Sequence, residues 1–493
     1  MNKLGVIVMI FLALLCISAV SAENNATDDS VLSEDTVPKD VEINKTASKI
    51  TSSKVTSYES FQTDVSFKLT SDDKPLVSKE VSILLNGARY TKITDKNGQA
   101  TLSVNLKKGT YTAEFSYAGD EFTNSTTAKT TVVINNPIKT SLKLGDKDIN
   151  YRQGSKCLFY VKLLNEKGKA IANQMVTFNV AGKTYSAKTD KNGVAQIFLN
   201  LKKGTYNVKY YFKKTAPYLS SSGSFKIKFK APMTKGNGYW LWAAHMKKIS
   251  LKNLAKHGTK HIFLHSAAIS SYGKSNVVSF IKKAHKYGIK VHLWMQLCYN
   301  GKWVSPVKNN GDFKYDFMNS KIRQAVNYAK IKGVDGVHFD YMRYGGTAHK
   351  HKNAVESINY MVKKATVKIH NIKPNCIVSG AIMPEPSMMK YYYGQDIPTL
   401  SRYVDALLPM VYRGNYHQTR SWIKSVTKTF VRESKGAQIW TGLQTYHSDS
   451  NTAKLSQSSL LKDANYAMKG GAKGVILFRI GISCNFNFNK VKS

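Results

Sequence analysis

A regular alternation of short apolar runs and longer amphipathic stretches, from about residue 238 to the C-terminus, most constrains the fold. Eight of the apolar runs have the length of β-strands. They cover residues 239–243, 261–265, 290–296, 336–340, 377–383, 406–412, 438–444 and 474–479. Eight strand–helix units in about 255 residues match the size of a (β/α)8 barrel, so the sequence predicts an α/β (β/α)8 TIM barrel over 236–493.

Two of the intervening stretches show helical periodicity, with apolar side chains recurring every three or four residues. In 276–287 and 321–331 these side chains are Val277, Phe280, Ile281 and Ala284, and then Ile322, Val326 and Ala329. Gly288 and Gly333 each follow a helical stretch and come shortly before an apolar run. Glycine is typical just past a helix end, so both positions predict αβ turns.

An internal repeat precedes the barrel. TDKNG at 94–98 recurs at 189–193, and LKKGTY at 106–111 recurs at 201–206. The common offset places two tandem copies at 45–135 and 138–229. Short alternating strands with Asn-Gly turns predict an antiparallel β-sandwich for each copy, and hence a multidomain chain with two all-β sandwiches before the barrel.

The TDKNG and LKKGTY segments resemble the bacterial immunoglobulin-like repeats of adhesin-like surface proteins, including those of methanogenic archaea. The resemblance implies Ig-like modules that either contact glycans or act as a stalk. Neither copy shows a cluster of exposed aromatic residues, which favours the stalk.

The N-terminus has the pattern of a secretory signal peptide at 1–22. Lys3 is followed by an apolar run to Val20 and by the small residues Ser21 and Ala22. The polar segment 23–44 has few large apolar residues and is expected to be a disordered spacer. No later apolar run is as long, so we expect no transmembrane anchor in the mature chain, and a secreted or cell-surface location.

The charge and the cysteine content limit the classes of partner and cofactor that the sequence suggests. The chain has 73 Lys and Arg against 31 Asp and Glu, a net charge of +42. For an exported protein this favours an anionic wall or surface glycan over nucleic acid, although a general lysine bias explains it equally well. The cysteines after Cys16 are scattered, which is typical neither of a disulfide scaffold nor of a zinc site, and no cofactor is expected.

The run GVDGVHFDYMRY at 333–344 gives the first candidate for chemistry. It ends an apolar strand on Asp340, and barrel enzymes keep their active sites at the carboxyl ends of the strands. Strand alternation places Gly336 and His338 on the same inward face as Asp340. Val337 and Phe339 are then expected to pack against helices.

A second carboxylate follows the fifth predicted strand, where Glu385 stands between Pro384 and Pro386. Two carboxylates at adjacent strand ends are what glycoside hydrolysis requires, so Asp340 and Glu385 are the candidate catalytic residues. The structural alternatives are an Asp340 paired to Arg343 and a Glu385 that is an ordinary exposed acid.

Further polar and aromatic residues at or just after predicted strand ends suit a hydroxyl-rich ligand. The candidate substrate-binding residues are His265, Trp294, Gln296, His338, Tyr341, Arg343, Tyr412, Gln444 and Arg479. A single histidine or glutamine at such a place is more often structural. Likewise, a tryptophan more often fills the space between barrel and helices.

Three segments together, 333–344, YGQD at 393–396 and YVDALLPMVY at 403–412, resemble a glycoside hydrolase barrel family long catalogued only as a domain of unknown function. The resemblance implies a polysaccharide-cleaving barrel distantly similar to the alpha-amylase type. There the fourth-strand aspartate is the nucleophile and the fifth-strand glutamate is the acid/base, and Asp340 and Glu385 stand at these positions. Asp405, at the start of its strand, is read as structural.

The chain departs from the family pattern at two places. Gly345 follows Tyr344 where the family usually has proline, and Arg-Gly-Asn-Tyr at 413–416 replaces Pro-Ser-His-Tyr. The second segment borders the sugar pocket, which puts the identity of the sugar in doubt.

Two other functions stay open from the sequence. One is a glycan-binding adhesin whose barrel has lost catalysis. The other is a metal-dependent polysaccharide deacetylase, for which His265, His292 and His338 lie on three neighbouring predicted strands.

Overall fold

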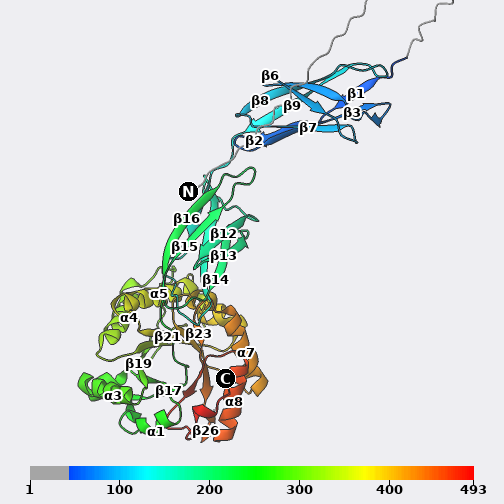
Figure 1. Ribbon diagram of the computed structural model, residues 1–493. Coiled ribbons are helices and arrows are strands. Elements are labelled where there is room, and N and C mark those ends of the chain that lie inside the picture. Colours follow the sequence, from blue (N-terminus) through cyan, green and yellow to red (C-terminus); the bar gives the residue numbers. More distant parts are fainter. Residues whose placement is uncertain (1–43, 493) are drawn as a thin grey trace, which may run out of the picture. The chain divides into compact units, whose positions relative to one another are not determined.

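The computed structural model describes residues 44–492, and the N-terminal part of these residues forms two β-sheets (Figure 1). One holds β1 (Ser48–Thr51), β3 (Thr63–Ser71), β4 (Lys74–Pro75) and β7 (Gln99–Val104), and the other holds β2 (Val55–Tyr58), β5 (Glu80–Leu85), β6 (Ala88–Ile93), β8 (Gly109–Tyr117) and β9 (Thr126–Asn135). Buried side chains alternate along β3 and β5, as in sheets that cover one side of a core. The expected signal peptide, and all of the expected spacer except residue 44, lie outside the described residues.

A second pair of sheets follows in the chain. It consists of β10 (Thr140–Leu144), β11 (Cys157–Asn165) and β14 (Val194–Leu199) in one sheet, and β12 (Met175–Val180), β13 (Lys183–Lys188), β15 (Gly204–Phe212) and β16 (Ser221–Phe229) in the other. The Phe159 ring of the first sheet lies 6.0 Å from Phe178 and 6.1 Å from Tyr210 of the second. The two sheets therefore share one core.

The repeated TDKNG segment forms the same turn in both copies. Asp95 Oδ1 accepts backbone N–H groups two and four residues later, at 2.8 and 2.9 Å, and Asp190 Oδ1 does so at 2.8 and 2.9 Å. Gly98 and Gly193 have φ values of +72° and +73°. A Cβ would meet a backbone carbonyl oxygen at 2.5 Å in the first copy and at 2.6 Å in the second. The turn therefore requires glycine at both positions.

The C-terminal part is a closed parallel barrel (Figure 1). Its strands are β17 (Gly238–Leu241), β18 (His261–His265), β19 (Lys290–Gln296), β20 (Gly336–Asp340), β21 (Ile377–Ile382), β22 (Ala406–Pro409), β23 (Gln438–Ile439), β24 (Thr441–Gln444) and β27 (Val475–Phe478). The sheet order begins at β23 and ends at β24, which are one chain segment interrupted at Trp440. The strands thus close into the expected barrel. The sixth ends at Pro409 rather than residue 412. The Val411 N–H still donates to the Gly442 carbonyl of β24 at 2.9 Å, but the Tyr412 N–H donates into a tight turn, to the Met410 carbonyl at 2.9 Å.

Helices surround the parallel strands (Figure 1). The α-helices are α1 (Leu251–Lys256), α2 (Ala267–Tyr272), α3 (Lys274–Lys286), α4 (Tyr315–Lys330), α5 (Ala354–Ile372), α6 (Ile397–Leu400), α7 (Arg420–Glu433) and α8 (Gln457–Lys469). Short helical turns lie at η1 (Ala243–His245), η2 (Ala348–Lys350), η3 (Pro386–Met388), η4 (Met389–Tyr393) and η5 (Phe488–Lys490), and a hairpin at β25 (Tyr446–Ser448) and β26 (Asn451–Lys454).

The four predicted apolar residues of α3 are buried. In α4, however, Val326 is only half-buried, because the buried face of the helix is centred on Met318, Ile322, Ala325 and Ala329 and Val326 lies at its edge. Among the described residues, none of the helices combines the length and apolarity needed to span a membrane.

The two faces of β20 follow the predicted alternation. Val337 and Phe339 belong to a buried cluster with Met318 and Ile322 of α4. His338, between them, is fully buried on the other face, where its Nε2 accepts a hydrogen bond of 3.1 Å from Trp240 Nε1 of β17. Asp340 therefore lies on the inward face, at the carboxyl end of the strand.

Asp405 joins the second sandwich to the base of the barrel. It directly precedes β22, and its Oδ1 accepts hydrogen bonds from Arg152 Nε at 2.8 Å and Asn150 Nδ2 at 2.7 Å. Its Oδ2 accepts the Val378 N–H of β21 at 2.8 Å. Burial acts to raise the pKa of Asp405, but Arg152, His370 and Lys230 outweigh it and hold that pKa well below its ordinary value. The carboxylate is thus a charged structural contact.

Replacing Arg152 by methionine should destabilise the barrel by about 3–5 kcal/mol, because the buried Asp405 carboxylate then loses its main counter-charge. All six tryptophans lie in the barrel, so tryptophan fluorescence during urea unfolding follows this part alone. The double variant Arg152→Met, Asp405→Asn should recover much of the loss, and exposed Arg89→Met should have little effect. An Arg152→Met protein as stable as the wild type would show that the ion pair contributes nothing.

Candidate functional site

A cavity of about 330 Å³ opens at the carboxyl ends of the barrel strands. Seven of the strands, or the segments directly after them, contribute to its wall, and most of the contributed side chains are aromatic. The lining residues are Trp240, Trp242, Trp294, Asp340, Tyr341, Arg343, Ala381, Met383, Met410, Tyr412, Asn415, Tyr416, Tyr446, Asp449 and Phe478. Five of the residues predicted from the sequence are brought together here: Trp294, Asp340, Tyr341, Arg343 and Tyr412.

Asp340 is held by two N–H donors. Its Oδ2 accepts a hydrogen bond of 2.9 Å from Trp294 Nε1, and its Oδ1 accepts one of 2.7 Å from the backbone N–H of Tyr341. Tyr341 has φ of +48°, a left-handed conformation that is unfavourable for a bulky residue. Backbone strain of this kind is typical of functional sites, and here it fixes the donor beside the carboxylate. Burial raises the pKa of Asp340 above its ordinary value, although both hydrogen bonds oppose this.

Asp340 is not held in place by an ion pair with Arg343. Among the described residues no nitrogen of Arg343 lies within 4.0 Å of a carboxylate oxygen. The guanidinium instead lies 4.6 Å from the centre of the Trp303 ring and 5.5 Å from that of Tyr393, and its Nη1 donates to the Tyr344 carbonyl at 3.1 Å. Its Nε is buried and has no hydrogen-bond partner. Arg343 is therefore held by aromatic rings and a backbone carbonyl and not by a carboxylate.

Glu385 lies beside the cavity but is not one of the residues that line it. Its Oε1 accepts hydrogen bonds of 3.1 Å from the hydroxyls of Tyr393 and Tyr416, and Tyr416 does line the cavity. Its Oε2 is buried and has no hydrogen-bond partner. Glu385 is therefore a half-buried residue with fixed neighbours, not an exposed loop acid.

Asp449 is a second carboxylate in the cavity wall that sequence reasoning missed. It lies in the turn between β25 and β26, where its Oδ1 accepts a bond of 2.8 Å from the Tyr446 hydroxyl and its Oδ2 accepts one of 2.9 Å from Asn415 Nδ2. Burial, followed by the charges of Asp340 and Asp449 among others, raises the pKa of Tyr412 well above its ordinary value. Tyr412 therefore stays protonated and can donate a hydrogen bond. Asp449 stands in a polar turn after a strand, which gives no signal in the sequence.

Three further predicted residues border the site without lining the cavity. The His265 ring lies 4.9 Å from both Trp242 and Trp294, and its buried Nε2 has no partner. The Arg479 guanidinium lies 5.6 Å from the Trp242 ring. Gln296 pairs with Asp340 in the β19–β20 register.

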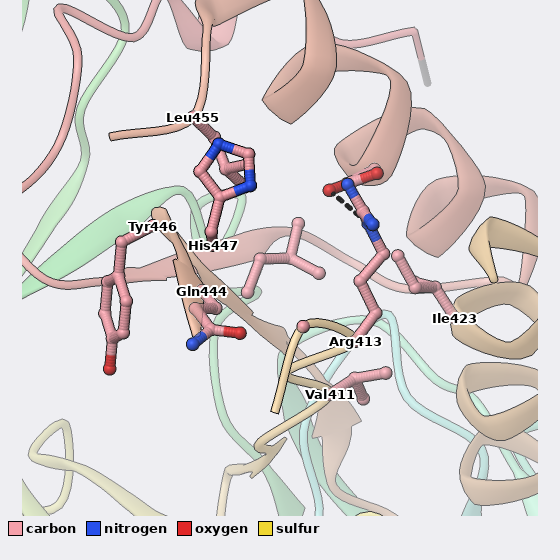
Figure 2. Close-up of a pocket in the computed structure, with 10 residues that line it drawn as sticks. Val411, Arg413, Ile423, Gln444, Tyr446, His447 and Leu455 are labelled. Atoms are coloured by element: carbon pink, nitrogen blue, oxygen red, sulfur yellow. Dashed lines mark hydrogen bonds and ion pairs between the residues drawn. The ribbon is translucent and has the colours of Figure 1, made fainter. Parts of the chain in front are cut away.

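Gln444 lines a different and much smaller cavity of about 30 Å³, shown in Figure 2. Its Nε2 donates to Asn415 Oδ1 at 2.9 Å. The same cavity is bounded by Arg413, and the dashed line in Figure 2 marks its ion pair of 2.9 Å with Asp463 of α8. Gln444 thus positions the loop that carries Asn415, which lines the larger cavity.

The barrel interior holds three buried histidines. His338 is bonded to Trp240 and, at 3.0 Å, to Ser379, while His261 Nδ1 lies 2.9 Å from His292 Nε2. Burial lowers the pKa of all three, to about 3 for His261 and His338 and well below the ordinary value for His292. His338 is therefore packed beneath the cavity and is not in its wall. Within residues 44–492 no three His, Cys, Asp or Glu side chains are placed to hold one metal ion, so His265, His292 and His338 do not form the ligand set considered above.

Comparison with solved structures gives distant structural neighbours. No protein-family model matches the chain, and no curated protein does. The PgaB (BpsB) glycoside hydrolase domain from Bordetella bronchiseptica is 10% identical, with a TM-score of 0.41 over 50% of this chain and 94% of that one. The spore cortex-lytic enzyme SleL from Bacillus cereus is 10% identical with a TM-score of 0.40, over 54% and 76%, and a GH18 chitinase from Cycas revoluta is 10% identical with a TM-score of 0.39, over 50% and 95%. Similarity at this level says nothing about activity, which has to be argued from the residues of the site.

Proposed function

We propose that the protein is a secreted or cell-surface glycoside hydrolase that cleaves a wall or surface polysaccharide in the mouth of its barrel. The observation that carries the proposal is the cavity of about 330 Å³ lined by aromatic rings around Asp340. Aromatic faces pack against the C–H faces of sugar rings, and a few fixed polar groups orient the hydroxyls.

The proposed chemistry divides between two carboxylates. Asp340 is the nucleophile or electrostatic stabiliser, because its two N–H donors hold the carboxylate in one orientation facing the cavity. Glu385 is the general acid/base. Its Oε1 accepts hydrogen bonds from Tyr393 and Tyr416, and Tyr416 lines the cavity, which connects Glu385 to the bound glycan.

The substrate is held by the remaining wall. Trp242 offers a ring face, Trp294 holds Asp340 through its Nε1, and Tyr412 donates a hydrogen bond. The net charge of +42 is the reason to propose an anionic wall or surface glycan as the polymer. Export rests on the N-terminal sequence pattern alone.

The mature protein should release reducing ends from at least one member of a panel of wall and capsular polysaccharides. Glu385→Gln should lower the rate by about a hundredfold or more, because general acid catalysis contributes on that scale. The matched control is Glu356→Gln, an exposed glutamate in the first turn of α5, which should leave the rate unchanged. Reducing-end release, measured with each variant on the same polymer, checks both statements.

Two outcomes would replace the proposal. Binding to a glycan in pull-down without release from any polymer would identify a glycan-binding, adhesin-like protein. Release of acetate without reducing ends, lost on addition of a chelator, would identify a metal-dependent deacetylase.

A further inference from the structure

The aromatic wall of the cavity continues beyond its rim. Tyr341, a lining residue, stacks on Tyr299 with ring centres 4.7 Å apart and an interplanar angle of 20°. Trp303 lies 5.4 Å from Tyr299 and 5.4 Å from Tyr341. Trp303 is nevertheless 41% exposed, although a ring of this size is usually covered. We call Tyr299, Trp303 and Tyr341 the rim platform.

The backbone holds Trp303 in this place. Residues 298–304 form a small hairpin, in which Tyr299 and Trp303 form an antiparallel bridge and Val304 N–H donates to the Cys298 carbonyl at 3.0 Å. Gly301, at the tip, has φ of +72°, which suits a tight turn. The exposed ring therefore projects from a hydrogen-bonded turn.

Two neighbours fix the indole against the site. A Cβ at position 345 would lie 2.6 Å from Trp303 Cε2 and 2.6 Å from its Nε1, so the absence of a side chain at Gly345 makes the room that the ring occupies. The Arg343 guanidinium lies 4.6 Å from the Trp303 ring centre, within cation–π range. Arg343 also lines the cavity, so the same residue connects the cavity to the rim platform.

We propose that the rim platform is an outer sugar subsite, which receives the glycan chain where it leaves the cavity and makes the preferred substrate a long polymer rather than a short oligosaccharide. This inference rests on the proposed function. The occupant is a continuation of the chain bound in the cavity, because the platform shares Tyr341 and Arg343 with the cavity wall. Trp303 supplies an apolar surface for a ring face.

The test compares binding of short and long oligosaccharides by calorimetry, with anionic uronic-acid oligomers from dimer to hexamer as the probe, because the proposed polymer is an anionic glycan. The wild type should bind the hexamer more tightly than the dimer. Trp303→Ala should lower hexamer affinity about tenfold, as truncation of an exposed binding tryptophan does, and leave dimer affinity unchanged. Gly345→Ala should give the same selective loss with the tryptophan still present, because the new Cβ displaces the ring.

Tyr287→Ala is the matched control. Tyr287 is also exposed, at 45%, but it follows α3 at the opposite ends of the strands. Hexamer binding that is unchanged in Trp303→Ala, while the wild type binds and cleaves glycan, would overturn the subsite and leave the proposed function intact. A wild type that binds no oligomer and releases no reducing ends from any polymer would overturn both.

Discussion

Asp340→Asn is expected to lower the rate of glycan hydrolysis by a factor of about 10² to 10⁴, the range in which a positioned carboxylate contributes to a proton-transfer or nucleophilic step. Asparagine keeps the shape of the side chain, and its amide oxygen can still accept one of the two N–H groups that now bond to Asp340. Glycan affinity should change little, because the wall of aromatic rings is intact. Reducing-end release and calorimetric binding, measured side by side, separate the two effects.

The pH profile tests the role of the carboxylate further. Burial raises the pKa of Asp340 above its ordinary value. If Asp340 acts in its ionised form, kcat/KM falls as the pH is lowered through this raised pKa. The acid limb of the pH profile should therefore lie above about pH 4, where ordinary aspartates titrate. The exposed Asp316→Asn, on the first turn of α4, is the control that should leave the profile unchanged. Full activity in Asp340→Asn would remove Asp340 from the mechanism.

Acid should lower the stability of the barrel through its buried histidines. His261, His292 and His338 are buried and neutral, with pKa values of about 3 for the first and last and well below normal for the second, whereas the unfolded chain protonates them near 6.5. Below about pH 6.5 these three histidines therefore bind more protons in the unfolded state than in the folded state, up to three in all. Stability is present above that pH and decreases as the pH falls toward 3, by roughly 1 kcal/mol per pH unit for each histidine and roughly 3 to 4 together.

The measurement is the urea midpoint of tryptophan fluorescence between pH 7 and pH 4. His338→Gln should flatten the slope by about one proton, because glutamine can accept from Trp240 Nε1 and donate to Ser379 without titrating in this range. The exposed His349→Gln should keep the wild-type slope. A His338→Gln protein with an unchanged slope would show that His338 is not neutral in the folded barrel.

The periodicity of apolar residues in the sequence was enough to predict the barrel and the two faces of β20. His338 and Asp340 share one face of β20 and Val337 and Phe339 the other, because side chains alternate along any strand. The offset between the two TDKNG segments likewise predicted two equivalent turns, and Asp95 and Asp190 make them with the same hydrogen bonds. These are local properties, since they depend on residues close together in the chain.

The composition of the site was only partly predictable. Asp340 and Tyr412 stand at strand ends, where a barrel places its chemistry, and both line the cavity. A position at or near a strand end does not tell how deep the side chain lies in the barrel. His338 was therefore expected in the cavity wall, but it lies beneath the wall. Asp449 reaches the cavity from a hairpin after the seventh strand, and no spacing in the sequence marks it.

The sequence by itself determined the barrel, the tandem repeat, the strand that ends on Asp340 and the pair of candidate carboxylates. Only the tertiary structure decided that Asp340 is held by Trp294 and Tyr341, that Glu385 contacts the cavity through Tyr416, and that Gly345 makes room for Trp303. The reason is physical. Local backbone preference and periodicity act between near neighbours in the chain, whereas a cavity wall is made by side chains from loops whose paths are fixed only when the barrel closes.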